Sequence, residues 1–148
     1  MKKIFFTLKP PDGSYGGGAF FVKNLSKFLI ENGYQITYTL ESDIDIIFII
    51  DPRKDSYNKF SLIDIERYKL KHPRVKIIHR VNECDIKRLR HIGIEPLLLR
   101  TMRIADHVVF VSKWLEDYYK QKYVLNITSS AILNGVDRTI FYTKEDRG

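Results

Sequence analysis

The apolar run at residues 46–50 is the feature of the sequence that most constrains the fold. Its order, Ile-Ile-Phe-Ile-Ile, leaves no polar residue on either face of an extended chain. A strand with one wet face alternates between apolar and polar residues, whereas a strand covered by helices on both faces is apolar throughout. The run is also far shorter than the ~20 residues of a membrane-spanning helix. It therefore predicts a central strand of a parallel sheet.

Strand-like and helix-like segments alternate along the rest of the chain. The helical period is clearest where Phe21, Leu25, Phe28 and Leu29 recur on one face. Expected strands lie at 4–6, 34–40, 46–50, 75–79, 107–111 and 129–133. Expected helices lie between the glycine loop and Asn32-Gly33, at about 58–71, at about 85–104, and after an N-capping Ser112. Such alternation predicts a doubly wound α/β domain, with helices on both faces of a mainly parallel, Rossmann-like sheet of about six strands.

Length and composition fit one domain over residues 1–148. Hydrophobic residues make up 44% and charged residues 29% of the chain, so disordered and low-complexity classes are excluded. The single cysteine, Cys84, excludes an intramolecular disulfide, and we interpret it as buried and inert rather than as a nucleophile. The four histidines do not cluster, so we expect no metal site. No signal-peptide pattern follows Met1, and we expect a cytoplasmic protein.

The positive charge is concentrated in the middle third of the chain. Residues 53–103 carry fourteen Lys or Arg against six acids, whereas the two flanking thirds are close to neutral. Five of these basic residues lie in the helical stretch expected at about 85–104, namely Lys87, Arg88, Arg90, Arg100 and Arg103. Such a stretch attracts the phosphates of nucleic acid, of anionic lipid or of a nucleotide-linked substrate, and a solvated basic face is an equally simple interpretation.

Gly16, Gly17 and Gly18 stand before the first expected helix. Glycines at this place let a ligand approach the backbone, and the helix N-terminus offers N–H groups to an anion. A dinucleotide-binding fingerprint is a poor match, although Glu41 stands near the end of the second strand, because Phe21 occupies the position of the third glycine. A Walker-type loop is excluded since no Gly-Lys-Ser/Thr follows. A flexible loop is the simpler alternative.

A second polar cluster surrounds the end of the fourth expected strand. Arg80 and Asn82 could bind a phosphate or an acceptor, and Glu83 or Asp85 could accept a proton or stabilise positive charge. Ligands of an open α/β sheet bind at the carboxyl ends of its strands, which favours this segment as a site. The alternative is helix capping by Asn82 or Asp85 together with surface salt bridges.

Three segments taken together resemble the family-4 glycosyltransferases of the GT-B fold. They are the glycine-rich start of the first helix at 16–22, the Ala-Asp-His-Val-Val-Phe-Val-Ser stretch at 105–112, and the Asn-Gly-Val-Asp turn at 134–137 that precedes Phe141. The resemblance spans residues 1 to about 142. It implies the acceptor-binding, amino-terminal half of a retaining enzyme that moves a sugar from a nucleotide sugar to a hydroxyl acceptor.

The resemblance also implies roles for the candidate residues. Gly17 and Gly18 would face the donor diphosphate, with Gly16 beside them, and Arg80 and Asn82 would bind acceptor or phosphate. Glu83 and Asp85 are the catalytic candidates, and we favour Asp85 because Asn82 could cap the helix in its place.

Further implications concern partners. The donor domain, with its Glu-x7-Glu motif, would be absent from these residues, and no cofactor or metal would be needed. Lipid-linked acceptors in the family make an anionic membrane surface a possible partner and nucleic acid an unlikely one. The alternative function is a stand-alone Rossmann-like module that binds a nucleotide or nucleic acid.

Overall fold

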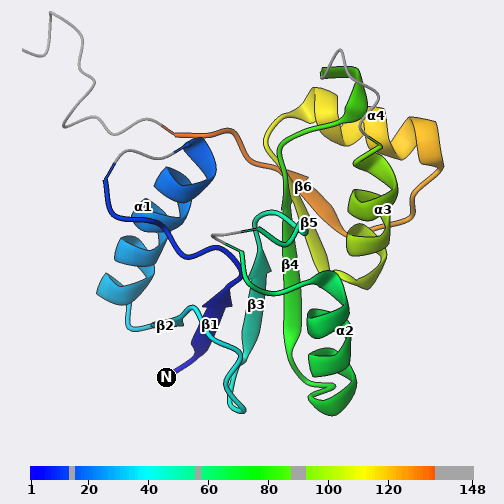
Figure 1. The fold of residues 1–148 in the computed structure, drawn as a ribbon. Coiled ribbons are helices and arrows are strands. Elements are labelled where there is room, and N and C mark those ends of the chain that lie inside the picture. Colours follow the sequence, from blue (N-terminus) through cyan, green and yellow to red (C-terminus); the bar gives the residue numbers. More distant parts are fainter. Residues whose placement is uncertain (14–15, 56–57, 88–92, 136–148) are drawn as a thin grey trace, which may run out of the picture.

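The structure, a computed structural model, describes residues 1–13, 16–55, 58–87 and 93–135. Six parallel strands form one sheet in the order β2-β1-β3-β4-β5-β6 (Figure 1). The strands are β1 (Lys3–Phe6), β2 (Gln35–Thr37), β3 (Ile46–Ile49), β4 (Lys76–Val81), β5 (His107–Phe110) and β6 (Ser129–Ala131). The predicted fold class, a doubly wound parallel α/β sheet of six strands, is confirmed.

Strand β3 lies in the middle of the sheet, as the apolar run predicts. It pairs in parallel with β1 on one side and with β4 on the other. Ile47 and Ile49 are buried in the core on one face of the sheet, while Ile46 and Phe48 pack on the other face. A strand that supplies two cores has no position for a polar side chain.

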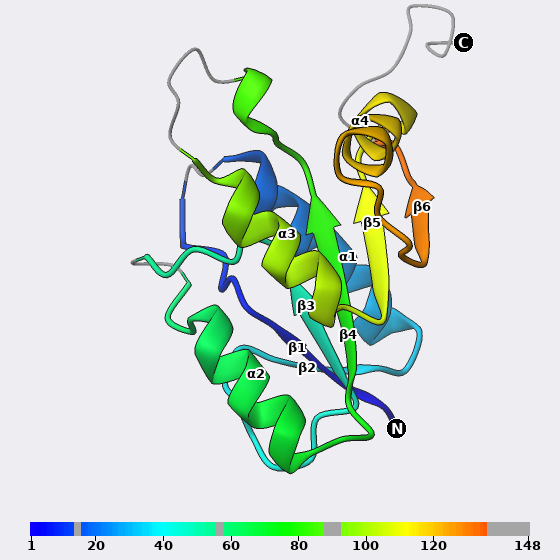
Figure 2. The same cartoon turned by 90° about the vertical axis from the view of Figure 1, so that its right-hand side faces the viewer.

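The four helices are divided unequally between the two faces of the sheet (Figures 1 and 2). Helix α1 (Gly17–Glu31) packs on one face, where Val22 contacts Ile4 and Phe6. Helices α2 (Leu62–Lys71), α3 (Glu95–Ile104) and α4 (Lys113–Tyr123) contribute to the cores on the other face. Along the sheet, the chain moves in one direction from β1 to β2 and in the opposite direction from β3 to β6. Because crossovers between parallel strands are right-handed, helices that connect strands in opposite directions lie on opposite faces of the sheet. The reversal lies between β1 and β3.

Capping residues explain where α2 and α4 begin. Ser61 accepts a hydrogen bond from the Asp64 amide, and the Asp64 carboxylate accepts one from the Ser61 amide, which forms a capping box. Helix α2 therefore begins at Leu62, whereas the sequence predicted a start near residue 58. Ser112 caps α4 through the amide of Leu115, as predicted.

The helix predicted at about 85–104 is divided in the structure. A short 3₁₀ turn, η1, covers Asp85–Lys87, and α3 begins at Glu95 with Pro96 in its first turn. Residues 88–92 between them lie outside the described residues. Among the described residues, no helix is long and apolar enough to cross a membrane.

Three strand ends differ from those expected by two residues or more, and one of them is β6, which ends at Ala131 rather than at 133. Strand β2 ends at Thr37, whose hydroxyl donates to the Glu41 carboxylate at 2.7 Å and so turns the chain away from the sheet edge. Strand β4 continues to Val81, two residues beyond the predicted end. His79 is therefore not the last residue of β4, Arg80 lies within the strand rather than after it, and the two side chains face opposite sides of the sheet.

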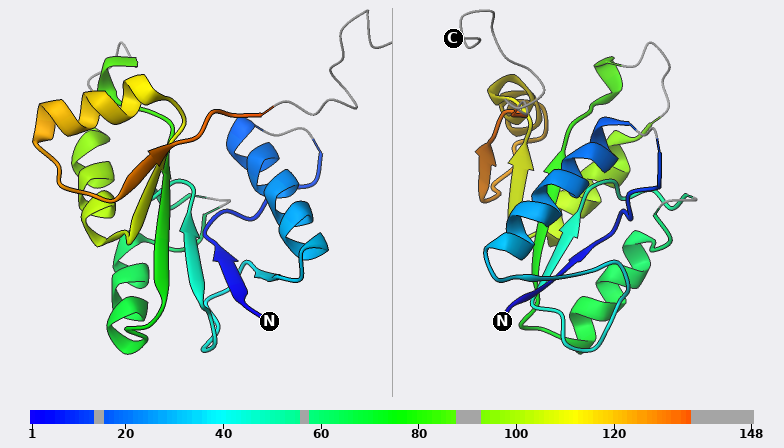
Figure 3. Two further views of the ribbon diagram at one scale, coloured as in Figure 1. Left: turned by 180° about the vertical axis from the view of Figure 1, so that it is seen from behind. Right: turned by 90° about the vertical axis from the view of Figure 1, so that its left-hand side faces the viewer.

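One face of the sheet is only partly covered by helices. Helix α1 lies over the β1 and β3 side of its face, and no other described helix lies on that face (Figure 3). Val109 of β5 is half-buried there, and Ile132 and Leu133, which follow β6, are 58% and 74% exposed.

Candidate functional site

The carboxyl edge of the sheet brings together segments that are far apart in the sequence. The start of α1 lies beside the chain that follows β6 (Figures 1 and 3). Gly17 and Asn134 line one pocket of about 630 Å³, together with Phe20, Asn24 and Phe28 of α1. Two of the segments that carry the family resemblance thus meet here, the glycine loop and the Asn134-Gly135 start of the 134–137 segment, whose remaining residues and Phe141 lie outside the described residues.

Helix α1 begins without a side-chain cap. Gly16 is the N-cap residue in an extended conformation, and the first turn contains no acidic residue. The amides of the first turn of a helix have no acceptor within that helix, so this end carries partial positive charge. A methyl group built at Gly17 would meet nothing within 4 Å, and one at Gly18 would meet only Ile50 Cγ2 at an ordinary 3.6 Å. Neither packing nor backbone strain requires glycine here, and the space beside these amides is open.

Arg80 is a buried cation near this end of α1. Only 4% of the residue is exposed. Its Nη2 donates a hydrogen bond to Asn134 Oδ1 at 2.9 Å, and its guanidinium lies 4.3 Å above the Phe21 ring of α1. Its buried Nη1 has no hydrogen-bond acceptor among the described residues. Burial lowers the pKa of Arg80, which records the cost of holding this charge away from water.

Glu83 is held at the edge by an arginine from the neighbouring loop. Arg53 Nη2 donates to Glu83 Oε1 at 2.7 Å, and Arg53 Nε donates to both oxygens of Asp51 at 2.9 and 3.0 Å. The hydrogen bond with Asp51 is the largest cause of the raised pKa of Arg53. The ion pairs join the loop that follows β3 to the loop that follows β4, and they leave the Glu83 side chain 13% exposed.

Asn58 braces the loop that carries Arg53. Its Nδ2 donates to the carbonyl oxygens of Asp51 and Arg53 at 2.5 and 2.7 Å. Its amide donates to Asp55 Oδ1 at 2.7 Å, and its carbonyl accepts from the Asp55 amide. Only 1% of Asn58 is exposed, so these hydrogen bonds to the chain on either side of Arg53 are shielded from water.

His79 lies under this cluster with its ring fully buried. Neither ring nitrogen has a hydrogen-bond partner in the described part of the chain. Burial lowers the pKa of His79 to about 3, although the charge of Asp51 acts in the opposite direction. His79 is therefore neutral at neutral pH and serves as a packed core residue.

Asp85 is not free to face the edge, and that expectation is wrong. Its Oδ1 accepts from the Ile94 amide at 3.0 Å and its Oδ2 from the Glu95 amide at 3.5 Å, so it caps the start of α3. Glu95 Oε1 in turn accepts from the Asp85 amide at 3.0 Å. Asn82, the expected cap, is exposed and forms no hydrogen bond with any described residue. The capping role that the sequence left open between the two residues belongs to Asp85.

Two other sequence interpretations concern single side chains. Cys84 is fully buried, as expected for an inert thiol. Glu41, which a dinucleotide site would use, is bound by Lys3 and by the hydroxyls of Thr37 and Thr39. The hydrogen bond from Lys3 is the main cause that lowers the pKa of Glu41 to about 2.

The basic middle third is not a uniform surface patch. Arg53 and Arg80 point into the site, and Arg100 forms an ion pair with Glu66 of α2. Arg103 is exposed, while Arg88 and Arg90 lie outside the described residues. Some of the basic side chains of this third therefore form contacts within the fold and do not contribute to a surface patch.

Sequence reasoning missed Asp51 and Arg53. Both directly follow β3, and the rule that favoured the residues after β4 applies equally to those after β3. The order Asp-Pro-Arg-Lys-Asp at 51–55 is the signal that could have identified them. In the described part of the chain, no three His, Cys, Asp or Glu side chains are grouped to hold a metal ion.

Comparison with known proteins identifies no function for this chain. No model of a protein family matches the chain, and no curated protein sequence matches it. The fold alone, a Rossmann-like parallel α/β sheet, is common to many activities.

We expect the buried His79 to make stability depend on pH. Below its ordinary pKa of 6.5 the unfolded chain binds a proton at this residue that the folded chain does not bind until about pH 3. The free energy of unfolding should therefore fall as the pH falls, by up to about 1.4 kcal/mol per pH unit. Urea unfolding between about pH 5 and 6.5, above the range where carboxylates titrate, measures this slope.

His79→Leu should remove most of the slope in that range, whatever it does to stability itself. His72→Gln, which changes a half-buried histidine at the end of α2, is the control. Equal slopes in the wild type and in His79→Leu would contradict the assignment.

The capping role of Asp85 gives a second expectation. Asp85→Ala removes both acceptors at the start of α3 and should lower the free energy of unfolding by about 1 kcal/mol. Asn82→Ala should leave it unchanged within experimental error. Urea denaturation of the two variants compares them directly, and an equal loss in both would show that Asn82 shares the cap.

Proposed function

We propose that this chain is the acceptor-binding half of a retaining glycosyltransferase, which moves a sugar from a nucleotide sugar to a hydroxyl acceptor. The observation that carries the proposal is the meeting of Gly17 and Asn134 in one pocket, with Arg80 hydrogen-bonded to Asn134. Two segments that resemble the family are thus neighbours at the edge where an α/β sheet binds its ligands.

The electrostatics of this edge suit a departing diphosphate. The open amides at the start of α1 and the guanidinium of Arg80 both favour negative charge. In such a transfer the bond from the anomeric carbon to the diphosphate breaks, and charge develops on the leaving phosphate oxygen. Preorganised donors aimed at that charge stabilise the transition state more than the ground state.

The third segment of the resemblance has a structural role in this chain. Asp106 accepts a hydrogen bond from the Ile77 amide at 2.9 Å and is paired with Lys76, which joins the start of β5 to β4. Ser112 caps α4. The 105–112 segment therefore fixes the position of β5 beside β4 and the start of α4. It supports the resemblance as a feature of the fold and contributes no group to the proposed reaction.

In this proposal Glu83 is the catalytic carboxylate. Arg53 fixes it at the edge, between the loops that follow β3 and β4. Asp85, the other candidate, is occupied as the cap of α3, and in the proposed enzyme it positions the loop between β4 and α3. The proposal requires a second domain for the donor, supplied by the same reading frame or by another chain.

Activity of the complete two-domain enzyme tests the proposal. Glu83→Gln should lower kcat by about tenfold or more, because it removes a charge beside the reacting centre while keeping the shape of the side chain. Glu66→Gln is the matched control, since Glu66 on α2 is paired with Arg100 on α3 as Glu83 is paired with Arg53. The measurement is transfer of labelled sugar from a panel of nucleotide sugars to polar and lipid acceptors.

A second variant addresses the glycine loop in the same assay. Gly17→Ala should raise the donor KM, because Gly17 lines the pocket and the added methyl group would meet no protein atom within 4 Å, so that it would occupy space open to the diphosphate. Unchanged melting temperatures would confirm that folding is intact. Wild-type kinetics in both variants, or donor hydrolysis by the 148-residue chain alone at the rate of a two-domain enzyme, would contradict the proposal.

We also expect the basic middle third to bind anionic membranes. Each Lys or Arg near such a surface contributes about 1 kcal/mol, so several give measurable binding that salt weakens. Sedimentation with anionic and with neutral vesicles measures it, with Arg103→Gln as the test variant and duplex DNA as competitor. Release by DNA at low concentration would favour the nucleic-acid module instead.

A further inference from the structure

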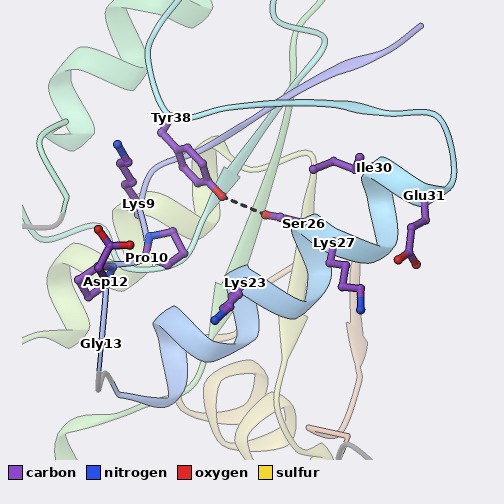
Figure 4. Close-up of a pocket in the computed structure, with 11 residues that line it drawn as sticks. Lys9, Pro10, Asp12, Gly13, Lys23, Ser26, Lys27, Ile30, Glu31 and Tyr38 are labelled. Carbon is purple, nitrogen blue, oxygen red and sulfur yellow. Dashed lines mark hydrogen bonds between the residues drawn. The ribbon is translucent and has the colours of Figure 1, made fainter.

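A second pocket lies on the other side of α1, at the carboxyl ends of β1 and β2. It has a volume of about 510 Å³. The chain at 9–13, which follows β1, forms one wall, α1 forms another, and Tyr38, the residue after β2, closes it (Figure 4). The pocket is large enough for a small metabolite and lies at the edge where parallel α/β sheets bind ligands.

Two hydroxyl groups lie at the centre of the pocket. Tyr38 Oη and Ser26 Oγ are 3.3 Å apart and share one hydrogen bond (Figure 4). Each hydroxyl carries one proton, so the pair uses one and keeps a second O–H that has no acceptor among the described residues. Either hydroxyl can be the donor of the shared bond, and both residues line the pocket, so a ligand bound there is an acceptor within reach of the remaining proton.

Cationic side chains surround these hydroxyls. Lys9 from the loop and Lys23 and Lys27 from α1 line the pocket. Asp12 and Glu31 also line it, and neither Lys9 nor Lys27 forms an ion pair with a described residue. Three ammonium groups against two carboxylates leave the pocket positive.

We propose that this pocket binds a small polyhydroxylated anion of the sugar-phosphate type. The phosphate would pair with Lys9 and Lys27, and the sugar hydroxyls would bond to Ser26 and Tyr38. Pro10, Pro11 and Ile30 supply apolar surface for the ring. Binding at this site does not depend on the proposed transferase activity.

The two pockets on either side of α1 are electrostatically linked. Lys27 and Glu31 line both of them. A phosphate held by Lys27 in this pocket therefore reduces the positive charge that faces the pocket of Gly17 and Asn134.

Titration of the ¹⁵N-labelled chain, followed by NMR, tests the proposal. The probes are glucose 6-phosphate, inorganic phosphate and glucose. Glucose 6-phosphate should shift the amides of Lys9, Asp12, Gly13 and residues 23–31, with a Kd of about 1 mM or tighter. Inorganic phosphate should bind the same residues more weakly, and glucose more weakly still.

Variants test the contacts to the phosphate and the contacts to the sugar separately. The double variant Lys9→Gln with Lys27→Gln should weaken binding of glucose 6-phosphate by about tenfold or more, and Lys9→Arg with Lys27→Arg should restore most of it. Tyr38→Phe should weaken glucose 6-phosphate and leave inorganic phosphate unchanged. The spectrum of each free variant shows that it is folded.

A matched control has the same net charge as the Lys9→Gln, Lys27→Gln double variant. Lys2→Gln with Lys59→Gln removes two exposed lysines that do not line the pocket, and it should leave the affinity unchanged. Equal weakening in this control would overturn the proposal in favour of general charge attraction. Absence of shifts at about 10 mM ligand, or shifts confined to Gly17 and Asn134, would also overturn it.

Discussion

The fold depends on the requirement that β3 be covered on both faces. A strand without a polar position can be stable only between two layers, and the chain meets this need by reversing its direction across the sheet between β1 and β3. The reversal sends α1 to one face and the other three helices to the opposite face. It also separates the loops that leave β1 and β3, which opens the edge where the candidate site lies.

Burial of Arg80 gives this edge its chemical character. A guanidinium withdrawn from water is costly unless something compensates its charge, and the Phe21 ring and Asn134 supply only part of that compensation. An anion bound near Arg80 would therefore be stabilised, because it would supply the compensation that Phe21 and Asn134 do not. The Glu83 carboxylate is paired with Arg53.

Sequence patterns predicted the elements well because those patterns are local. The period of α1, the apolar run of β3 and the Ser112 cap each depend on residues within a few positions of one another. The end of β4, the cap of α3 and the pairing of Glu83 are set by contacts across the fold. Asp85 reaches amides nine and ten residues further along the chain, and Arg53 meets Glu83 thirty residues away. No spacing rule links such residues, so the candidate carboxylates could be found from the sequence while their roles could not.

The partly uncovered face of the sheet affects how copies of this chain behave toward one another. Ile132 and Leu133, which follow β6, leave apolar surface in water, and apolar surfaces of this kind attract their like. A net charge of +7 opposes that attraction by keeping copies apart. Salt screens the repulsion and leaves the apolar attraction in place, so the chain is best kept in solution at low ionic strength.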